Sequence, residues 1–204
     1  MLYLLRHGET AWNTEQRLIG QQDVPLNETG RAQAHRLAGV LASVPFTAIY
    51  TSDLQRASET AGIIATVHGM KPIRERRLRE CGVGAWEGHT WAEIAEQWPE
   101  ELAQLQDDFL GCPPGGESLQ ALCDRATAAL LEIVDRHPGG KIAIVGHGGS
   151  LSALIIHALG ASLAAFPRLR LDNCSITTIR IRDDGLYSLT AFNDTCHLAV
   201  KVRG

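Results

Sequence analysis

The sequence lacks the features that mark secreted, zinc-binding or membrane-spanning proteins. Its five cysteines are odd in number and widely spaced, with no C-x-x-C pair, so they predict neither a disulfide framework nor a zinc site. No apolar run approaches the length of a membrane span, and the run at the N-terminus is too short for a signal peptide. We therefore expect a cytoplasmic protein with reduced thiols.

An excess of positive charge is also missing. The 204 residues include 19 Lys and Arg against 23 Asp and Glu, a formal net charge of -4, which favours neither nucleic acid nor an anionic membrane as a partner. The eight histidines form no H-x-H or H-E-x-x-H pair, so we expect no metal and no other cofactor. Any anion site must be a local concentration of arginines.

What the sequence does contain is an alternation of strand-like and helix-like segments, which predicts an α/β fold. Short apolar runs predict strands at 2–5, 47–51 and 141–146, and 175–181 with 186–192 predict a hairpin about the turn Asp183-Asp184-Gly185. Apolar residues at helical spacing predict helices at 28–41, 54–68, 117–136 and 151–159. We expect one domain, 1–204, with three α/β/α layers, a mostly parallel central sheet and a small helical cap inserted at about 85–116.

The first strand ends in Arg6-His7-Gly8, where the glycine is expected to permit a sharp turn. Ligands of open α/β sheets bind at the carboxyl ends of the strands. The arginine disfavours a second positive charge and so keeps the imidazole neutral. A neutral imidazole beside an anion-binding arginine is a candidate nucleophile for a phosphate ester, although a plain surface Arg–His pair explains these few residues equally well.

A second histidine follows the strand 141–146, in His147-Gly148-Gly149-Ser150 at the start of a helix. Helix N-termini present unpaired amides and a positive dipole end, which suit a phosphate oxygen, and glycines let an anion approach the backbone. Because the motif follows the clearest strand of the chain, an anion site is favoured over a simple turn.

Two further residues suit the same chemistry. Arg56, one turn into the helix after the second strand, could reach over the sheet edge and bind phosphate through two parallel hydrogen bonds. Taken alone, an ion pair with Asp53 or Glu59 is the better explanation of this arginine. Glu80 could protonate a leaving oxygen and then activate water, but alone it is an ordinary surface acid.

Taken together, the motifs resemble those of the histidine phosphatase superfamily, the phosphoglycerate-mutase-like proteins. The motifs, in the order of that family, are L-L-R-H-G-E-T-A-W-N, S-D-L-Q-R-A-S-E-T-A, L-R-E with G-x-W-E-G, P-G-G-E-S and V-G-H-G-G. They run from residue 4 to about residue 150, and with the C-terminal segment the resemblance covers essentially the whole chain.

The resemblance implies a role for each matching residue. His7 would become a phosphohistidine, and Glu80 would be the general acid for the leaving alcohol and then the general base for water. Arg6, Arg56 and His147 would surround the phosphoryl group and stabilise its charge. The residues that would contact the phosphate or the substrate are Thr10, Asn13, Gly20 and Gly148. The family needs no metal, because arginines supply the positive charge.

The resemblance also indicates which branch of chemistry to expect. Where the mutases of the superfamily carry E-R-x-Y-G, this chain has E-C-G-V-G, and residues 89–112 contain no lysine or arginine to clasp an anionic phosphoglycerate. We therefore expect a metal-independent phosphomonoesterase acting on a small metabolite such as phosphoserine or α-ribazole phosphate. The alternatives are a phosphoglycerate mutase and a non-catalytic module that binds a phosphorylated ligand.

Several features remain open at this level. Ile19 and Gly82 replace residues that are usually polar in the family, which would make the pocket less polar or roomier. Trp86, Trp91 and Trp98 would line an apolar entrance or, more simply, pack within the cap. His197 would reach the rim of the pocket or, by the favoured interpretation, serve the terminal segment structurally. A homodimer is left open, with the polar cap as its candidate surface.

Overall fold

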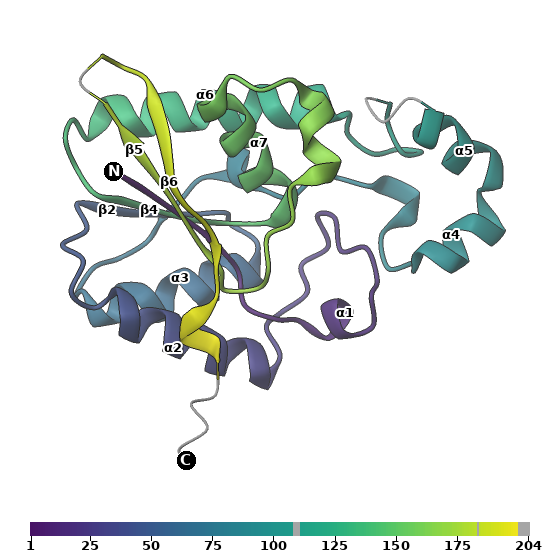
Figure 1. Cartoon of the computed structure of the whole chain (residues 1–204). Helices are drawn as coiled ribbons and strands as arrows, with labels where there is room; N and C mark the ends of the chain where they lie inside the picture. The colour runs from purple at the N-terminus through teal and green to yellow at the C-terminus, as the bar shows by residue number, and fades with distance from the viewer. Residues whose placement is uncertain (108–110, 183, 200–204) are drawn as a thin grey trace.

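A six-stranded mixed sheet organises the chain in the computed structural model, which describes residues 1–107, 111–182 and 184–199 (Figure 1). The strand order is β3-β2-β4-β1-β5-β6. The strands are β1 (Leu2–Arg6), β2 (Ala48–Thr51), β3 (Ile73–Arg74), β4 (Ile142–Gly146), β5 (Ile176–Ile181) and β6 (Tyr187–Asp194). The first four are mutually parallel, whereas β5 and β6 are antiparallel to their neighbours.

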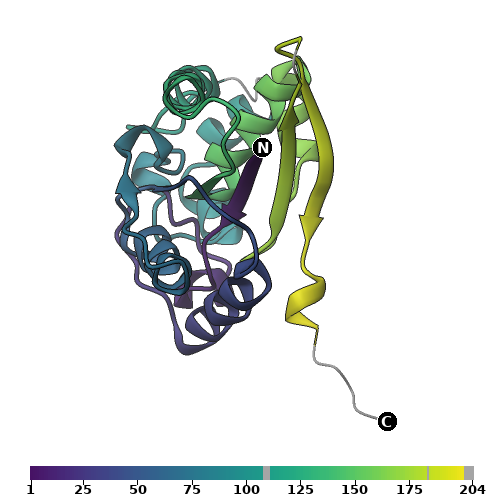
Figure 2. The same ribbon diagram turned by 90° about the vertical axis from the view of Figure 1, so that its left-hand side faces the viewer.

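Helices cover both faces of this sheet. α2 (Glu28–Leu41) and α3 (Gln55–Val67) pack on one face, and α6 (Leu119–Arg136) and α7 (Gly148–Leu159) on the other (Figures 1 and 2). The side chains of β1 contribute to the cores on both faces of the sheet, because successive side chains of a strand point to opposite faces. Leu2 and Leu4 join the core beneath α6 and α7, and Leu5 joins the core beneath α2 and α3.

The pairing of β1 with β4 brings the two predicted histidines together. Arg6 pairs with Gly146 in register, and the His7 amide donates to the Gly146 carbonyl at 3.0 Å. His7 and His147 therefore leave neighbouring strands at the same edge. The short helices α1 (Ala11–Thr14), α4 (Trp91–Gln97) and α5 (Pro99–Asp107) lie at this carboxyl end of the parallel strands (Figure 1).

Short 3-10 turns complete the chain: η1 (Arg76–Leu78), η2 (Gly84–Trp86), η3 (Leu163–Arg168) and η4 (Cys196–Leu198). None of the helices formed by the described residues is both long and apolar enough to span a bilayer.

The predicted α/β class and its layers are confirmed, and α2 has the predicted bounds. Within the region expected to form a helical cap, the described residues form two helices, α4 and α5, which are divided at Trp98-Pro99 because proline lacks an N–H and suits the first position of a helix. The elements that sequence patterns missed, α1, β3 and η3, are too short or too irregular to show a period. Of the predicted hairpin turn, Asp183 lies outside the described residues.

Gly8 has a different reason to be glycine than the one expected. Its φ angle is not positive, and a Cβ atom there would lie 2.4 Å from the carbonyl oxygen of Gly30, at the start of α2. The residue is therefore required by close packing of the segment after β1 against α2, and not by a turn.

Candidate active site

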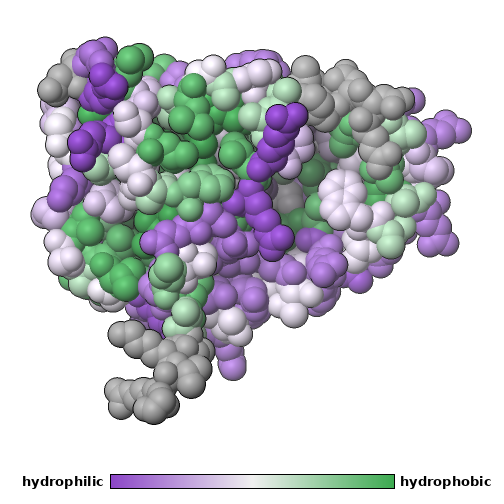
Figure 3. Space-filling view, in the orientation of Figure 1, coloured by the Kyte–Doolittle hydropathy of each residue, from purple (hydrophilic) through white to green (hydrophobic). Residues whose placement is uncertain are grey.

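A cavity of about 560 Å³ opens at the carboxyl ends of β1 and β4. In the space-filling view the surface is hollowed between the sheet layers and the α4–α5 segment (Figure 3). Seven of the nine predicted site residues line this cavity: Arg6, His7, Asn13, Gly20, Arg56, Glu80 and Gly148. The other two, Thr10 and His147, are fully buried beside it and do not line it.

His7 is held in one tautomer. Its Nδ1 lies 2.7 Å from the Gly8 carbonyl oxygen, which can only accept a hydrogen bond, so Nδ1 carries the proton and Nε2 has a free lone pair. Burial, followed by the charges of Arg56 and Arg6, lowers the pKa of His7 well below its usual value. The ring is therefore a neutral imidazole at neutral pH, with Nε2 available as a nucleophile.

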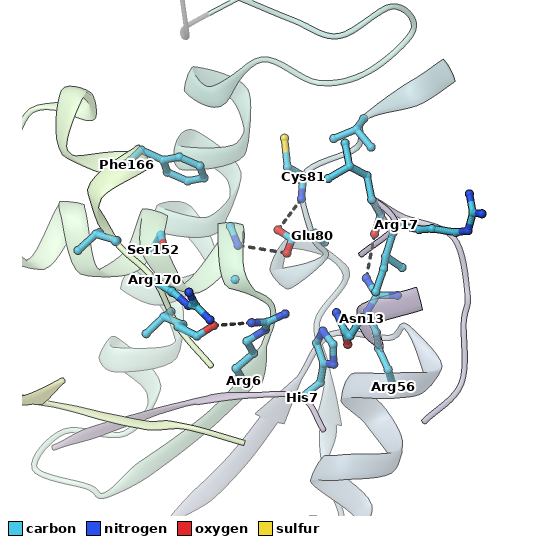
Figure 4. A pocket seen from close by; sticks show the side chains of 18 of the residues that line it. Arg6, His7, Asn13, Arg17, Arg56, Glu80, Cys81, Ser152, Phe166 and Arg170 are labelled. Atoms are coloured by element: carbon cyan, nitrogen blue, oxygen red, sulfur yellow. Dashed lines mark hydrogen bonds between the residues drawn. The ribbon is translucent and has the colours of Figure 1, made fainter. Parts of the chain in front are cut away.

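Two guanidiniums flank this ring, that of the buried Arg56 and that of the partly buried Arg6. Figure 4 shows Arg6 on one side of His7 and Arg56 on the other, with the Glu80 carboxyl above them. Arg56 donates to the carbonyls of Gly20 and Gln22, each at 2.8 Å, and Arg6 donates to the Leu171 carbonyl.

No carboxylate in the described part of the chain forms an ion pair with Arg6 or Arg56. The Nε atoms of Arg6 and Arg56 have no hydrogen-bond partner among the described residues, so both can bind an anion. Burial lowers the pKa of Arg56 to about 10, which still leaves it charged at neutral pH. The simple surface explanation of Arg56 is wrong, because Asp53 pairs with Arg79 and Glu59 with Arg31.

Thr10 acts through Asn13 and not through the cavity. Thr10 caps α1, and the Asn13 Oδ1 atom accepts from the Thr10 amide and hydroxyl, both at 3.1 Å. The Asn173 amide adds a third bond to the same oxygen at 3.3 Å. Because Oδ1 is occupied, the Nδ2 donor is the polar atom that Asn13 can offer to a ligand.

The carboxyl group of Glu80 is held by two backbone amides. Oε1 accepts from Cys81 at 2.9 Å and Oε2 accepts from Gly149 at 3.1 Å. A Cβ on Gly149 would lie 2.3 Å from Oε1, whereas one on Gly148 would lie 3.8 Å from Oε2. The predicted role of Gly148 as a contact of the phosphate or substrate stays a prediction, and the bond from Gly149 to Glu80 was not predicted, although both glycines stand in the G-H-G-G motif.

His147 lies next to His7, with ring centroids 5.2 Å apart. It is fully buried, and both ring nitrogens lack hydrogen-bond partners among the described residues. Burial, then the charge of Arg56, lowers its pKa well below the usual value. His147 is therefore neutral at neutral pH and has hydrogen-bonding capacity that no protein group in the described structure uses.

Sequence reasoning offered Trp91 as one possible residue of the entrance and missed the rest of the opening of the cavity. The side chains there come from several loops and short helices: Arg17, Leu18, Trp91, Phe166, Leu169 and Arg170. Of the earlier open questions, Ile19 and Trp91 line the cavity, while Gly82, Trp86 and His197 do not. Trp86 is buried and packs edge-on against Trp91, in agreement with packing inside the cap.

Within the described residues, no group of three or more His, Cys, Asp or Glu side chains is arranged to hold a metal ion. The cavity brings together a neutral imidazole, two arginine side chains and one carboxyl group. These are the groups needed to bind a phosphoryl group and to move it to nitrogen.

Comparison with known proteins agrees with this chemistry. Residues 2–195 match the model of the histidine phosphatase superfamily, branch 1. The probable phosphoglycerate mutase GpmB of Cronobacter sakazakii is 41% identical over 181 residues, which cover 87% of this chain and 83% of that protein.

Two solved structures have the same fold. YhfR of Bacillus stearothermophilus is 37% identical with a TM-score of 0.89, covering 97% of this chain and 98% of that one. A variant of phosphoserine phosphatase from Entamoeba histolytica, solved with phosphoserine, is 31% identical with a TM-score of 0.85 and the same coverage. The chain belongs to the histidine phosphatase superfamily, and the resemblance seen in its motifs is confirmed.

Proposed function

We propose that this member of the histidine phosphatase superfamily is a metal-independent phosphomonoesterase that forms a phosphohistidine on His7. The observation that carries the proposal is the fixed tautomer of His7, with a free Nε2 on a ring that lies between Arg6 and Arg56. An attacking nitrogen needs an unprotonated lone pair, and the phosphoryl group needs positive charge on its equatorial oxygens.

In the first step, His7 Nε2 attacks phosphorus while the bond from phosphorus to the substrate oxygen breaks. Glu80 gives its proton to that oxygen, so the alcohol leaves neutral. Arg6 and Arg56 bind the oxygens of the phosphoryl group throughout, and the Asn13 amide donates a further hydrogen bond. A substrate dianion beside Glu80 favours the protonated form that this step requires.

In the second step, Glu80 removes a proton from a water molecule whose oxygen attacks the phosphohistidine. The nitrogen–phosphorus bond breaks, inorganic phosphate leaves, and Glu80 is again protonated. We propose that His147 donates to a phosphoryl oxygen as charge develops, a role supported by the 5.2 Å between the centroids of its ring and that of His7 and by the lack of a partner for its ring nitrogens among the described residues.

A small phosphate ester such as phosphoserine or α-ribazole phosphate is our proposed substrate, and the phosphoserine complex of the related phosphatase supports the class. Phosphoglycerate mutase is the second candidate, favoured by the name of the GpmB relative. Against it stand the absence of lysine and arginine from residues 89–112 and the engagement of Arg17 by Glu15 and Glu93.

The test is phosphate release from a panel of monoesters in EDTA, by the wild type and by His7→Ala. The panel contains phosphoserine, α-ribazole phosphate, 3-phosphoglycerate and sugar phosphates. We expect one preferred ester, hydrolysed by the wild type and not by His7→Ala. Absence of release from every ester, with conversion of 3-phosphoglycerate primed by 2,3-bisphosphoglycerate, would establish the mutase instead.

A further inference from the structure

The backbone that carries Glu80 has no regular structure of its own. η1 ends at Leu78, and residues 79–83 form neither helix nor strand. A general acid must stay within hydrogen-bond reach of the leaving oxygen, so something outside this segment has to fix its position.

Arg125 on α6 supplies that fixation. Its Nη1 donates to the carbonyls of Arg77 and Arg79, at 2.7 and 2.8 Å, and its Nη2 donates to the carbonyl of Glu80 at 2.9 Å. A single side chain thus binds three carbonyls within four consecutive residues, the last of them that of the proposed acid itself.

Glu117 completes the arrangement. It accepts from Arg125 Nε at 2.6 Å and from Nη2 at 2.7 Å, so all three guanidinium nitrogens of Arg125 are engaged. The same carboxylate accepts from the Gly82 amide at 3.2 Å, and the Glu117 amide donates to the Gly82 carbonyl at 2.7 Å. Arg125 and Glu117 therefore bind the backbone on both sides of Glu80 through hydrogen bonds.

Neither side chain lines the cavity, and each is mostly shielded from water, with 21% of Arg125 and 17% of Glu117 exposed. At such exposure charge-assisted hydrogen bonds of this length are stronger than they are at the surface. Lysine could not replace the arginine, because it lacks the planar fork that reaches the carboxylate and the carbonyls together.

We propose that Arg125, oriented by Glu117, is a positioning residue for the Glu80 acid. The inference rests on the proposed function, since it concerns the proton that Glu80 delivers to the leaving group. Its expected signature is a loss that depends on the leaving group, because an alkyl alcohol needs the proton and an activated aryl alcohol scarcely does.

The experiment compares Arg125→Lys with Arg77→Lys in the full chain. Arg77 lies on the same segment and also pairs with two carboxylates, Glu75 and Glu132, but its side chain makes no contact with Glu80. The readout is kcat/KM for the preferred alkyl ester divided by kcat/KM for 4-nitrophenyl phosphate, with far-UV circular dichroism and a urea titration for each variant.

We expect Arg125→Lys to lower this ratio about 10-fold or more, a part of the 10²- to 10⁴-fold that a general acid contributes, and Arg77→Lys to leave it unchanged. If Arg125→Lys does not fold, Glu117→Gln takes its place, because it keeps the size of the side chain and removes its charge. Equal losses on both esters in a folded variant would overturn the positioning role while leaving the proposed function intact. Failure of the proposed function itself would show in the wild type, as no release from either ester.

Discussion

The floor and the mouth of the cavity are built in opposite ways. The floor, defined as the lining residues His7, Arg6, Arg56 and Glu80 together with the buried His147 beside them, comes mainly from the ends of β1 and β4, the start of α3 and the segment bound by Arg125. His7 is 2% exposed and Arg56 is fully buried.

The mouth, defined as Arg17, Leu18, Trp91, Phe166, Leu169 and Arg170, comes from loops and short helices. Trp91 is 53% exposed, and the Arg170 side chain is 89% exposed, with an ion pair to Asp172 at 3.2 Å. Under the proposed function, this difference assigns the phosphoryl chemistry to the floor, where the His7, Arg56 and Glu80 side chains are held by hydrogen bonds, and substrate choice to the mouth. Changes in the floor should then affect every ester, and changes in the mouth should affect some esters only.

The largest effect should come from the acid of the floor. We expect Glu80→Gln to lower kcat/KM for alkyl esters by about 10²- to 10⁴-fold, because their leaving oxygen needs a proton, and for 4-nitrophenyl phosphate by less than about 10-fold. Steady-state kinetics on the two esters measures this directly. An equal loss on both would remove the acid role of Glu80.

The second-largest effect on activity should come from the substitution Gly149→Ala. The Cβ of Gly149→Ala would meet Glu80 Oε1 at 2.3 Å and push the carboxyl away, so we expect about 10-fold or more lost on alkyl esters. Gly148→Ala is the matched control, because its Cβ would lie 3.8 Å from the same carboxyl, an ordinary contact. If both variants lose the same activity, steric pressure on Glu80 is not the cause.

The buried histidines of the floor should make the fold sensitive to acid. The pKa values of His7 and His147 are well below the usual value, so below about pH 6.5 the unfolded chain binds protons that the folded chain does not. Stability is therefore retained above that pH and lost as pH falls, by up to about 1.4 kcal/mol per pH unit for each histidine.

Urea titrations at about pH 7 and about pH 5 measure this loss. We expect His147→Asn to lose less stability between the two conditions than the wild type, because one titrating group is gone. The exposed His35→Asn is the control and should follow the wild type. If His147→Asn loses as much stability between the two pH values as the wild type does, His147 is not neutral in the folded protein.

The smallest and most selective effects belong to the mouth. We expect Arg170→Ala to raise KM only for esters that carry a second anionic group, by less than about 10-fold, because the side chain is highly exposed and screened. Esters without that group should be unaffected in the same assays. An equal rise of KM for all esters would mean that Arg170 does not act on substrate choice, and it would contradict the division between floor and mouth.

The same division explains what the sequence could predict. Arg6 ends β1, His7 and His147 directly follow β1 and β4, and the register of parallel strands places such residues at one edge. Glu80 and Arg56 could be placed only through the family resemblance, since each alone is an ordinary surface residue. Thr10 was predicted as a contact but is buried and orients Asn13, a distinction that depends on side-chain hydrogen bonds.

The mouth and the Arg125 clamp were beyond sequence reasoning for a physical reason. Trp91 and Arg170 lie 79 positions apart in the chain, and no period or motif links them. Arg125 is one polar residue of an amphipathic helix, and its bonds to three carbonyls follow from how α6 packs beside η1. Contacts of this kind are set by tertiary packing, which a local pattern does not encode.

The most direct test of the account is to identify the phosphorylated atom. Glu80→Gln should accumulate the intermediate from 4-nitrophenyl phosphate, because the base that activates water is missing. Peptide mapping and ³¹P NMR after a rapid quench would locate the phosphoryl group. We predict phosphate on Nε2 of His7, the nitrogen left free by the bond from Nδ1 to Gly8. Phosphate on Nδ1 or on another residue, or no phosphoenzyme at all, would contradict the central claim.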